Sequence, residues 1–325
     1  MKTSFMFFLL FALSLTLFSQ PRDEEKERQR HAESNIKTIT QWTHRFSQGK
    51  PNPTGYKTTE THYDKKGNPI EIINYRSNGE ISSRLLYKYN DQNLRTEYLM
   101  YQRDGKDFKL TFKQTFHYNS KGLKTHEVVF DGVTGYRITY EYMPNDQLKE
   151  IVKYGSNNSV EERWLYSYKN NIQEISIFKP DKVLNSIARK IFDPKGNLIE
   201  DIRLDSKGNE QKKVIYTFDS KNRNTEMAEY YSGKLSKKLQ YNLNDSDLVT
   251  EIAQENSDGT KFTQSIYIYD SNGSLVEERW SENKTEEFSL KQSSYDKDGN
   301  IIETDSYFAP YRYRVLYKYT YEYHK

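Results

Sequence analysis

Aromatic and aliphatic residues recur along the chain at every second position, with polar residues between them. Typical stretches are Leu85-x-Tyr87-x-Tyr89, Trp164-x-Tyr166-x-Tyr168 and Val214-x-Tyr216-x-Phe218. A period of two is typical of a β-strand that has one apolar face. Each stretch therefore predicts a strand whose aromatic side chains share one face.

The last residue of each stretch marks a repeat, and we call it the reference position. It is aromatic in all repeats but one: Tyr63, Tyr89, Tyr118, Tyr142, Tyr168, Phe192, Phe218, Leu243, Tyr269, Tyr295 and Tyr321. Successive reference positions lie 24 to 29 residues apart, most often 26. Self-similarity at such an interval predicts a repeat architecture.

Two turns follow in each repeat. The first has the form Asp64-Lys65-Lys66-Gly67-Asn68, in which Asp caps the turn and Gly accepts the left-handed backbone of a type I turn with a G1 bulge. The second is looser, as in Ser206-Lys207-Gly208-Asn209. Two turns per period predict two antiparallel strands per repeat, so residues 36–325 should form an all-β meander of about 20 strands.

A sheet of this length cannot stay flat, because an open sheet beyond about 10 strands curls, splits or closes. We therefore expect a long, twisted, partly closed sheet or a superhelical shell with the tyrosines inside.

Glutamate recurs eight residues after the reference position. This Glu row is Glu71, Glu97, Glu150, Glu200, Glu226, Glu251, Glu277 and Glu303. The bulge glycine shifts the parity by one, which favours placing the Glu row on the tyrosine face. In the alternative register it faces the other way, near basic residues such as Arg84, Arg163 and Lys238. Because catalysis needs one constellation and not eight copies, we interpret the row as a structural ladder.

The first 19 residues have the order of a secretory signal peptide, with Lys2, an apolar run from Phe5 to Phe18 and Ser19. An uncleaved anchor is the alternative.

Residues 20–35 form a charged lead that can be helical, and Ile36–Phe46 with Gly55–Tyr63 predicts an opening hairpin that caps the first edge of the sheet. Without cysteine there is neither a lipid-attachment site nor a disulfide. We expect a periplasmic, cell-surface or secreted protein that does not span a membrane after signal cleavage.

Composition narrows the function classes. Of 325 residues, 49 are Lys or Arg and 46 are Asp or Glu, with 28 tyrosines, and the mean hydropathy is −0.99. The low aliphatic content argues against a large α/β enzyme domain. Basic residues are scattered among acidic ones, so the chain has no continuous positive surface to bind a phosphate backbone. We therefore expect no nucleic-acid partner.

The pattern in Tyr295-Asp296-Lys297-Asp298-Gly299-Asn300-Ile301-Ile302-Glu303 resembles the bacterial YD-repeat (Rhs-like) family over roughly residues 56 to 325. The resemblance implies β-hairpin architecture. In large members of that family a spiral sheet encloses a cargo, and only the hairpin architecture is carried over to this chain.

Candidate chemistry is sparse. We find no catalytic motif, no histidine pair at zinc spacing and no cofactor fingerprint, so we predict no enzyme activity, no metal and no cofactor. Aromatic rings can stack on sugars or contact proteins, which makes Trp164, Tyr166, Tyr216 and Tyr267 candidate ligand-binding residues, although sheet packing explains the same residues.

These features predict a non-catalytic scaffold or binding protein of the bacterial cell envelope. It would present a long β-surface to a protein partner, which can belong to an outer-membrane complex, or to a glycan. The alternatives are an outer-membrane β-barrel and an enzyme with a site inside the shell. Charged residues opposite the tyrosines, such as Arg84, Glu141 and Lys213, and the short turns argue against the barrel.

Overall fold

The computed structural model covers the whole chain and describes residues 24–281 and 287–325. The predicted signal peptide, residues 1–19, lies outside the described residues. The charged lead contains one helix, α1 (Glu24–Glu33), and two short 3-10 helices follow later, η1 (Pro180–Lys182) and η2 (Ala309–Tyr311). All other regular structure in the described part of the chain is β.

The strands follow one another through the chain as hairpins. They are β1 (Ile36–Ser47), β2 (Lys50–Pro51), β3 (Tyr56–Tyr63), β4 (Pro69–Tyr75), β5 (Ile81–Tyr89), β6 (Arg95–Asp104), β7 (Asp107–Tyr118), β8 (Lys124–Phe130), β9 (Gly135–Tyr142), β10 (Leu148–Tyr154), β11 (Val160–Lys169), β12 (Ile172–Phe178), β13 (Leu184–Phe192), β14 (Leu198–Asp205), β15 (Glu210–Phe218), β16 (Asn224–Tyr231), β17 (Lys234–Leu243), β18 (Val249–Asn256), β19 (Lys261–Tyr269), β20 (Leu275–Trp280), β21 (Ser289–Tyr295), β22 (Ile301–Phe308) and β23 (Tyr313–Tyr323).

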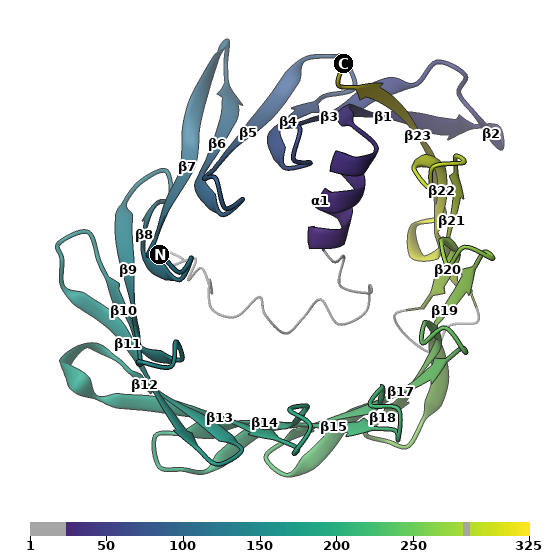
Figure 1. Ribbon diagram of the computed structural model, residues 1–325. Helices are drawn as coiled ribbons and strands as arrows, with labels where there is room; N and C mark the ends of the chain where they lie inside the picture. The colour runs from purple at the N-terminus through teal and green to yellow at the C-terminus, as the bar shows by residue number, and fades with distance from the viewer. Residues whose placement is uncertain (1–23, 282–286) are drawn as a thin grey trace, which may run out of the picture.

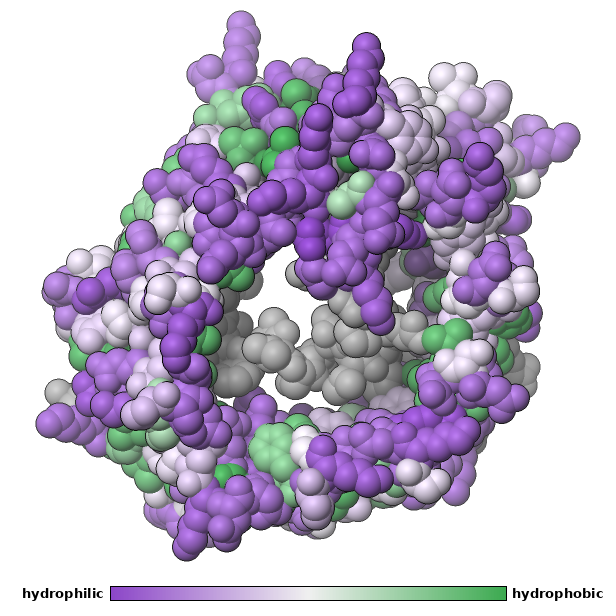
Figure 2. Space-filling view, in the orientation of Figure 1, coloured by the Kyte–Doolittle hydropathy of each residue, from purple (hydrophilic) through white to green (hydrophobic). Residues whose placement is uncertain are grey.

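The sheet closes on itself. Strand β1 pairs antiparallel with β3 on one side and with the last strand, β23, on the other, while β2 is a two-residue side strand on β1. Among the described residues the ring therefore has 22 strands, every neighbouring pair antiparallel. Only an even number of strands closes an entirely antiparallel ring, because directions alternate around it. Figure 1 shows the ring along its axis, and Figure 2 shows the opening at its centre.

Closure confirms the all-β antiparallel meander and corrects its predicted shape. The opening hairpin does not cap a free edge, because β1 forms hydrogen bonds on both sides. The partly closed sheet or shell is a closed barrel instead. The register that joins Thr40 to Thr320 and Trp42 to Lys318 links positions almost 280 residues apart, and no local pattern marks that pairing.

The prediction that the mature chain does not span a membrane is also overturned. That prediction rested on the charged residues opposite the tyrosines and on the short turns, and it did not foresee that the sheet closes. A closed antiparallel barrel satisfies its backbone groups between strands and has no edge, which is the form in which a sheet crosses a bilayer.

The first turn forms as predicted in most repeats; β11 and β12 are instead joined by the shorter turn at Asn170 and Asn171. In the β3–β4 turn the Asp64 carboxylate accepts hydrogen bonds from the backbone N–H of Lys66 and of Asn68, both at 2.9 Å, and Gly67 is left-handed with φ +79°. Repeats without this glycine place Asn or Asp in the same conformation, as at Asn93 and Asp247. These residues tolerate positive φ better than other non-glycine residues do.

The register places the Glu row on the face opposite the tyrosines, so the favoured sequence register is wrong. In β15–β16, Phe218 pairs with Asn224 but Thr217 pairs with Glu226, so Thr225 is an extra, unpaired residue. This second irregularity shifts the parity once more. The Thr225 hydroxyl donates to the Thr217 carbonyl at 3.2 Å, and Thr125 and Thr250 make the same bond in their repeats.

Helix α1 identifies the inner face of the barrel. It lies inside the ring (Figure 1), and its buried His31 packs edge-on against the ring of Tyr63, with centroids 4.6 Å apart. Tyr63 is a reference-position residue. The tyrosine face therefore lines the lumen, and the face with the Glu row points outward.

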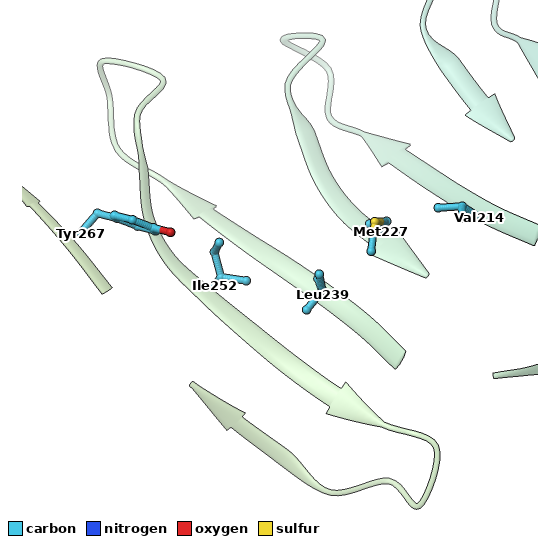
Figure 3. Packing of buried hydrophobic residues seen from close by; sticks show 5 residues of the cluster. All are labelled: Val214, Met227, Leu239, Ile252 and Tyr267. Carbon is cyan, nitrogen blue, oxygen red and sulfur yellow. The ribbon is translucent and has the colours of Figure 1, made fainter. Parts of the chain in front are cut away.

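The wall is one sheet thick, so its buried side chains pack against side chains of neighbouring strands in the same sheet. Figure 3 shows Val214, Met227, Leu239, Ile252 and Tyr267 from five successive strands, β15 to β19, packing side by side on the lumenal face. Leu239 is completely buried although no second layer covers the sheet. The close approach of inward-pointing side chains on the concave face supplies the burial.

We expect Leu239→Ala to lower the free energy of unfolding by about 2–5 kcal/mol, because it leaves a cavity in this cluster. The outward Leu165, 38% exposed, is the matched control, and Leu165→Ala should cost less than about 1 kcal/mol. Chemical denaturation followed by tyrosine fluorescence measures both. Equal losses would contradict the placement of Leu239 in a closely packed lumenal cluster.

Candidate functional site: the lumen and the outer wall

The lumen is lined by two tyrosine rows, one at the reference position and one two residues before it. Hydroxyl groups of the reference row donate to backbone carbonyls 20 residues earlier. Tyr269 bonds Val249 at 2.9 Å, Tyr295 bonds Leu275 at 2.8 Å and Tyr321 bonds Ile301 at 2.7 Å. These hydroxyls hold each repeat to the preceding one.

The structure distributes the candidate ligand-binding residues around the lumen. Trp164 and Tyr166 lie on β11, Tyr216 on β15 and Tyr267 on β19. Each group lies four strand spacings from the next, which is about 19 Å across the sheet at ~4.8 Å per spacing. Trp164 and Tyr267 are only 5% and 7% exposed. The four residues do not form one cluster, and ligand binding by any of them stays a prediction.

Trp164 has one unusual feature. Its Nε1 is buried and has no hydrogen-bond partner among the described residues. Its ring lies between Ile151 of β10 and Ile177 of β12 in the register. An indole N–H in such surroundings loses solvation without a replacement bond, so the residue contributes mainly apolar packing area.

The outer wall carries the Glu row, and most of its carboxylates contact a cation. The pairs join neighbouring strands: Glu71–Arg84 at 2.5 Å, Glu97–Lys88 at 2.7 Å, Glu150–Arg163 at 3.1 Å, Glu226–Lys238 at 3.0 Å and Glu303–Lys318 at 3.5 Å. Glu251 instead accepts hydrogen bonds from Thr263 and Asn242. We call the Glu row and its paired Arg and Lys side chains the outer ion-pair belt.

Twelve residues after the reference position the outer wall carries a second row. It comprises Tyr75, Tyr101, Phe130, Tyr154, Leu204, Tyr230 and Tyr307. Cations cover several of the rings, as Arg137 does Tyr154 at 4.5 Å and Lys57 does Tyr75 at 5.0 Å. This outer aromatic rim runs along one end of the barrel, the end away from the aspartate turns.

Several of the turns at the opposite end contact the turn of the next repeat. Lys121 contacts Asp146 at 2.7 Å, the amides of Asn197 and Asn222 bond each other, and Arg223 contacts Asp247 at 2.9 Å. Each of these links spans 24 or 25 residues, so it joins equivalent turns of successive repeats.

Hydrogen bonds lower the pKa of aspartates in these turns. The amide of Asn197 donates to Asp193 at 2.8 Å, and two backbone N–H groups add to it, which holds the pKa of Asp193 below its usual value of 3.8. The same arrangement with Asn209 lowers the pKa of Asp205. The turns therefore favour ionised aspartate in the folded state.

The described residues contain no group of three or more His, Asp or Glu side chains placed to hold a metal ion. Nor does any helix among residues 24–281 and 287–325 have the length and apolar character needed to cross a membrane. The carboxylates that repeat along the chain are engaged with neighbouring cations and amides instead of converging on one point.

Sequence reasoning missed two features of this site. The outer aromatic rim has the same parity as the Glu row, so the register that placed the Glu row on the tyrosine face concealed it. A signal for the correct parity was available in the threonines seven residues after the reference position, whose hydroxyls bond the bulge. The docking of α1 on the turns had no sequence signal, because its contacts are to backbone carbonyls.

Comparisons with known proteins give low similarities. No family model and no curated protein matches the chain. Among solved structures, a crystal structure of TcdB2-TccC3 is 15% identical, covers 81% of this chain and has a TM-score of 0.33, but this chain spans only 16% of that one. The resemblance to YD repeats stays a prediction.

Two porin-like proteins are similar over nearly their whole length. The protein from Bacteroides uniformis ATCC 8492 is 13% identical, with coverage of 89% of this chain and 97% of that chain and a TM-score of 0.31. The protein from Bacteroides vulgatus ATCC 8482 is 10% identical, with coverage of 88% and 98% and a TM-score of 0.25. At these scores the backbones superpose poorly, so function is argued from the geometry of this chain.

The lowered pKa of Asp193 has a consequence for acid stability. A carboxylate whose pKa is depressed by folding stabilises the protein above its unfolded-state pKa, and this contribution is lost as the pH falls through the folded-state pKa. We therefore expect Asp193→Asn to lower the denaturation midpoint at pH 7, with the difference from wild type shrinking as the pH falls below about 4. Asp245→Asn, at an exposed turn carboxylate, should change little at either pH. A difference independent of pH would contradict this role.

Proposed function

We propose that this protein is an exported β-barrel of the bacterial outer membrane, whose lumen is a passage narrowed by α1. The observation that carries the proposal is the closed ring of 22 antiparallel strands. In a bilayer every backbone polar group needs an internal partner, and among sheets only a closed barrel meets that need. An export signal at residues 1–19 would bring the chain to the envelope.

Dimensions support the proposal. Most strands are seven to twelve residues long, and a tilted membrane strand needs about nine to eleven. The strand number is even, as in bacterial outer-membrane barrels. The outer aromatic rim matches one of the two interfacial girdles that such barrels carry, since tyrosine rings favour the boundary between hydrocarbon and water.

The outer ion-pair belt supports a second candidate. In that candidate the protein is an exported scaffold that presents its outer wall to a protein partner, which can belong to an outer-membrane complex, or to a glycan. A cation facing lipid at the bilayer midplane costs about 2–4 kcal/mol, and the belt places several there. Cross-strand pairing with carboxylates lowers that cost, and a polar partner surface removes it. Neither candidate assigns a catalytic step to the chain.

Single cysteines separate the two candidates, because the natural chain has none. Leu165→Cys places a thiol on the outer wall, and Val133→Cys places one in a turn at a residue that is 85% exposed. Each variant is labelled with an environment-sensitive fluorophore and reconstituted into vesicles containing lipids that carry nitroxides on their acyl chains.

For a membrane barrel we expect strong quenching of the fluorophore at position 165 and little at position 133. The same sample in planar bilayers should conduct ions through the lumen. If neither position is quenched and the protein stays in the aqueous phase after fractionation of the cell envelope, the outer-membrane proposal fails and the scaffold candidate replaces it.

A further inference from the structure

Helix α1 touches the barrel on both sides of the closing strand pair. The β3–β4 turn lies on one side of the β1–β23 pair, and the β21–β22 turn lies on the other. Arg28 donates to the Lys66 carbonyl in the first turn at 2.7 Å, and Arg30 donates to the Gly299 carbonyl in the second at 2.9 Å. The helix therefore spans the closure.

The contact with the first turn is unusually close. A Cβ built on Gly67 would lie 2.0 Å from the Arg28 carbonyl oxygen and 2.9 Å from the Ala32 nitrogen. No side chain other than hydrogen fits there. The corresponding glycine of another aspartate turn, Gly196, has nothing within 4 Å of its hypothetical Cβ. Gly67 is therefore required by the close approach of α1 as well as by the conformation of the turn.

The start of β1 and the end of β23 meet at the same place. Asn35, which directly precedes β1, is left-handed with φ 52°, and its carbonyl accepts a hydrogen bond from the His324 N–H at 2.8 Å. The imidazole Nε2 of His324 lies 3.1 Å from the Tyr63 carbonyl oxygen. The helix, the first turn and the last strand are therefore joined at one rim of the barrel.

This closure is the one pairing in the ring that is not local. All other strand pairs come from hairpins or adjacent segments, whereas β1 and β23 are joined through the whole chain, and the entropic cost of closing a loop rises with its length. Contacts that hold this pair closed therefore offset an entropic cost that the hairpin pairs do not carry. A ten-residue helix is marginal alone in water, so α1 is ordered by what it docks on.

We propose that α1 is a clamp that holds the β1–β23 pair closed and thereby sets the chain as a barrel instead of an open spiral sheet. The clamp works through backbone carbonyls of two turns, with Arg28 and Arg30 as its two attachment points and Gly67 as its seat. Release of α1 would loosen the closing pair while leaving the hairpins elsewhere intact.

Amide hydrogen exchange with Gly67→Ala tests the clamp, with Gly196→Ala as the matched control. Both variants put alanine at a left-handed glycine, with φ +79° and +87°, so the local strain is the same and only the clash with α1 differs. A second variant, Arg28→Ala with Arg30→Ala, releases the helix without straining a turn. Exchange is followed in α1, in β1 and β23, and in β15 and β16 across the barrel.

In Gly67→Ala and in the double arginine variant we expect α1 to lose protection and the amides of β1 and β23 to exchange at least about tenfold faster, with β15 and β16 unchanged. Gly196→Ala should leave all three regions as in wild type. Release of α1 without faster exchange at the closing pair overturns the clamp, as does an α1 that stays protected in both variants. Faster exchange at that pair in Gly196→Ala attributes the effect to turn strain and overturns it too. The experiment uses purified full-length protein, so its outcome is independent of whether the barrel sits in lipid.

Discussion

The backbone hydrogen bonds between β1 and β23 are the interaction on which the rest of this structure depends. Hairpins place each strand beside its neighbours, but a chain of hairpins can form an open spiral equally well. Pairing of the first strand with the last converts the array into a ring, removes both edges and creates an inside. The lumen, the outer wall and the position of α1 exist only because this pair forms.

A one-layer wall must obtain its stability within the layer. On the lumenal face, aliphatic and aromatic side chains of adjacent strands bury one another, as around Leu239. On the outer face, carboxylates and cations pair across strands, as do Glu150 and Arg163. Each repeat interacts almost only with the next, so stability is a sum of neighbour terms. Among the described residues, the β1–β23 pair and the contacts of α1 and His324 couple the two ends.

The outer wall combines two kinds of surface. Its aromatic rim is suited to a boundary between lipid and water, whereas its ion-pair belt is suited to water or to a polar partner. The closed ring favours the first environment, because complete backbone pairing is what a bilayer demands. The cross-strand distances in the belt, such as 2.5 Å for Glu71–Arg84, show charges that neutralise one another locally.

Much of the fold was predictable because its information is local. Aspartate and glycine in Asp64–Asn68 specify a turn through bonds within five residues, and alternation specifies strands in the same way. The outward direction of the Glu row was mispredicted, because a single extra residue after the turn, such as Thr225, inverts the face of everything beyond it. The dispersal of Trp164, Tyr166, Tyr216 and Tyr267 over three strands followed from the repeat spacing once the strand order was known.

The sequence by itself determined the repeat, the turns, the antiparallel meander and the two-faced character of each strand, since each of these depends on residues a few positions apart. Tertiary structure alone decided that the ring closes, which face is inside, and where α1 docks. The physical reason is that these features depend on contacts between residues far apart in the chain. Those contacts join backbone groups, which are common to all residues and leave no pattern in the sequence.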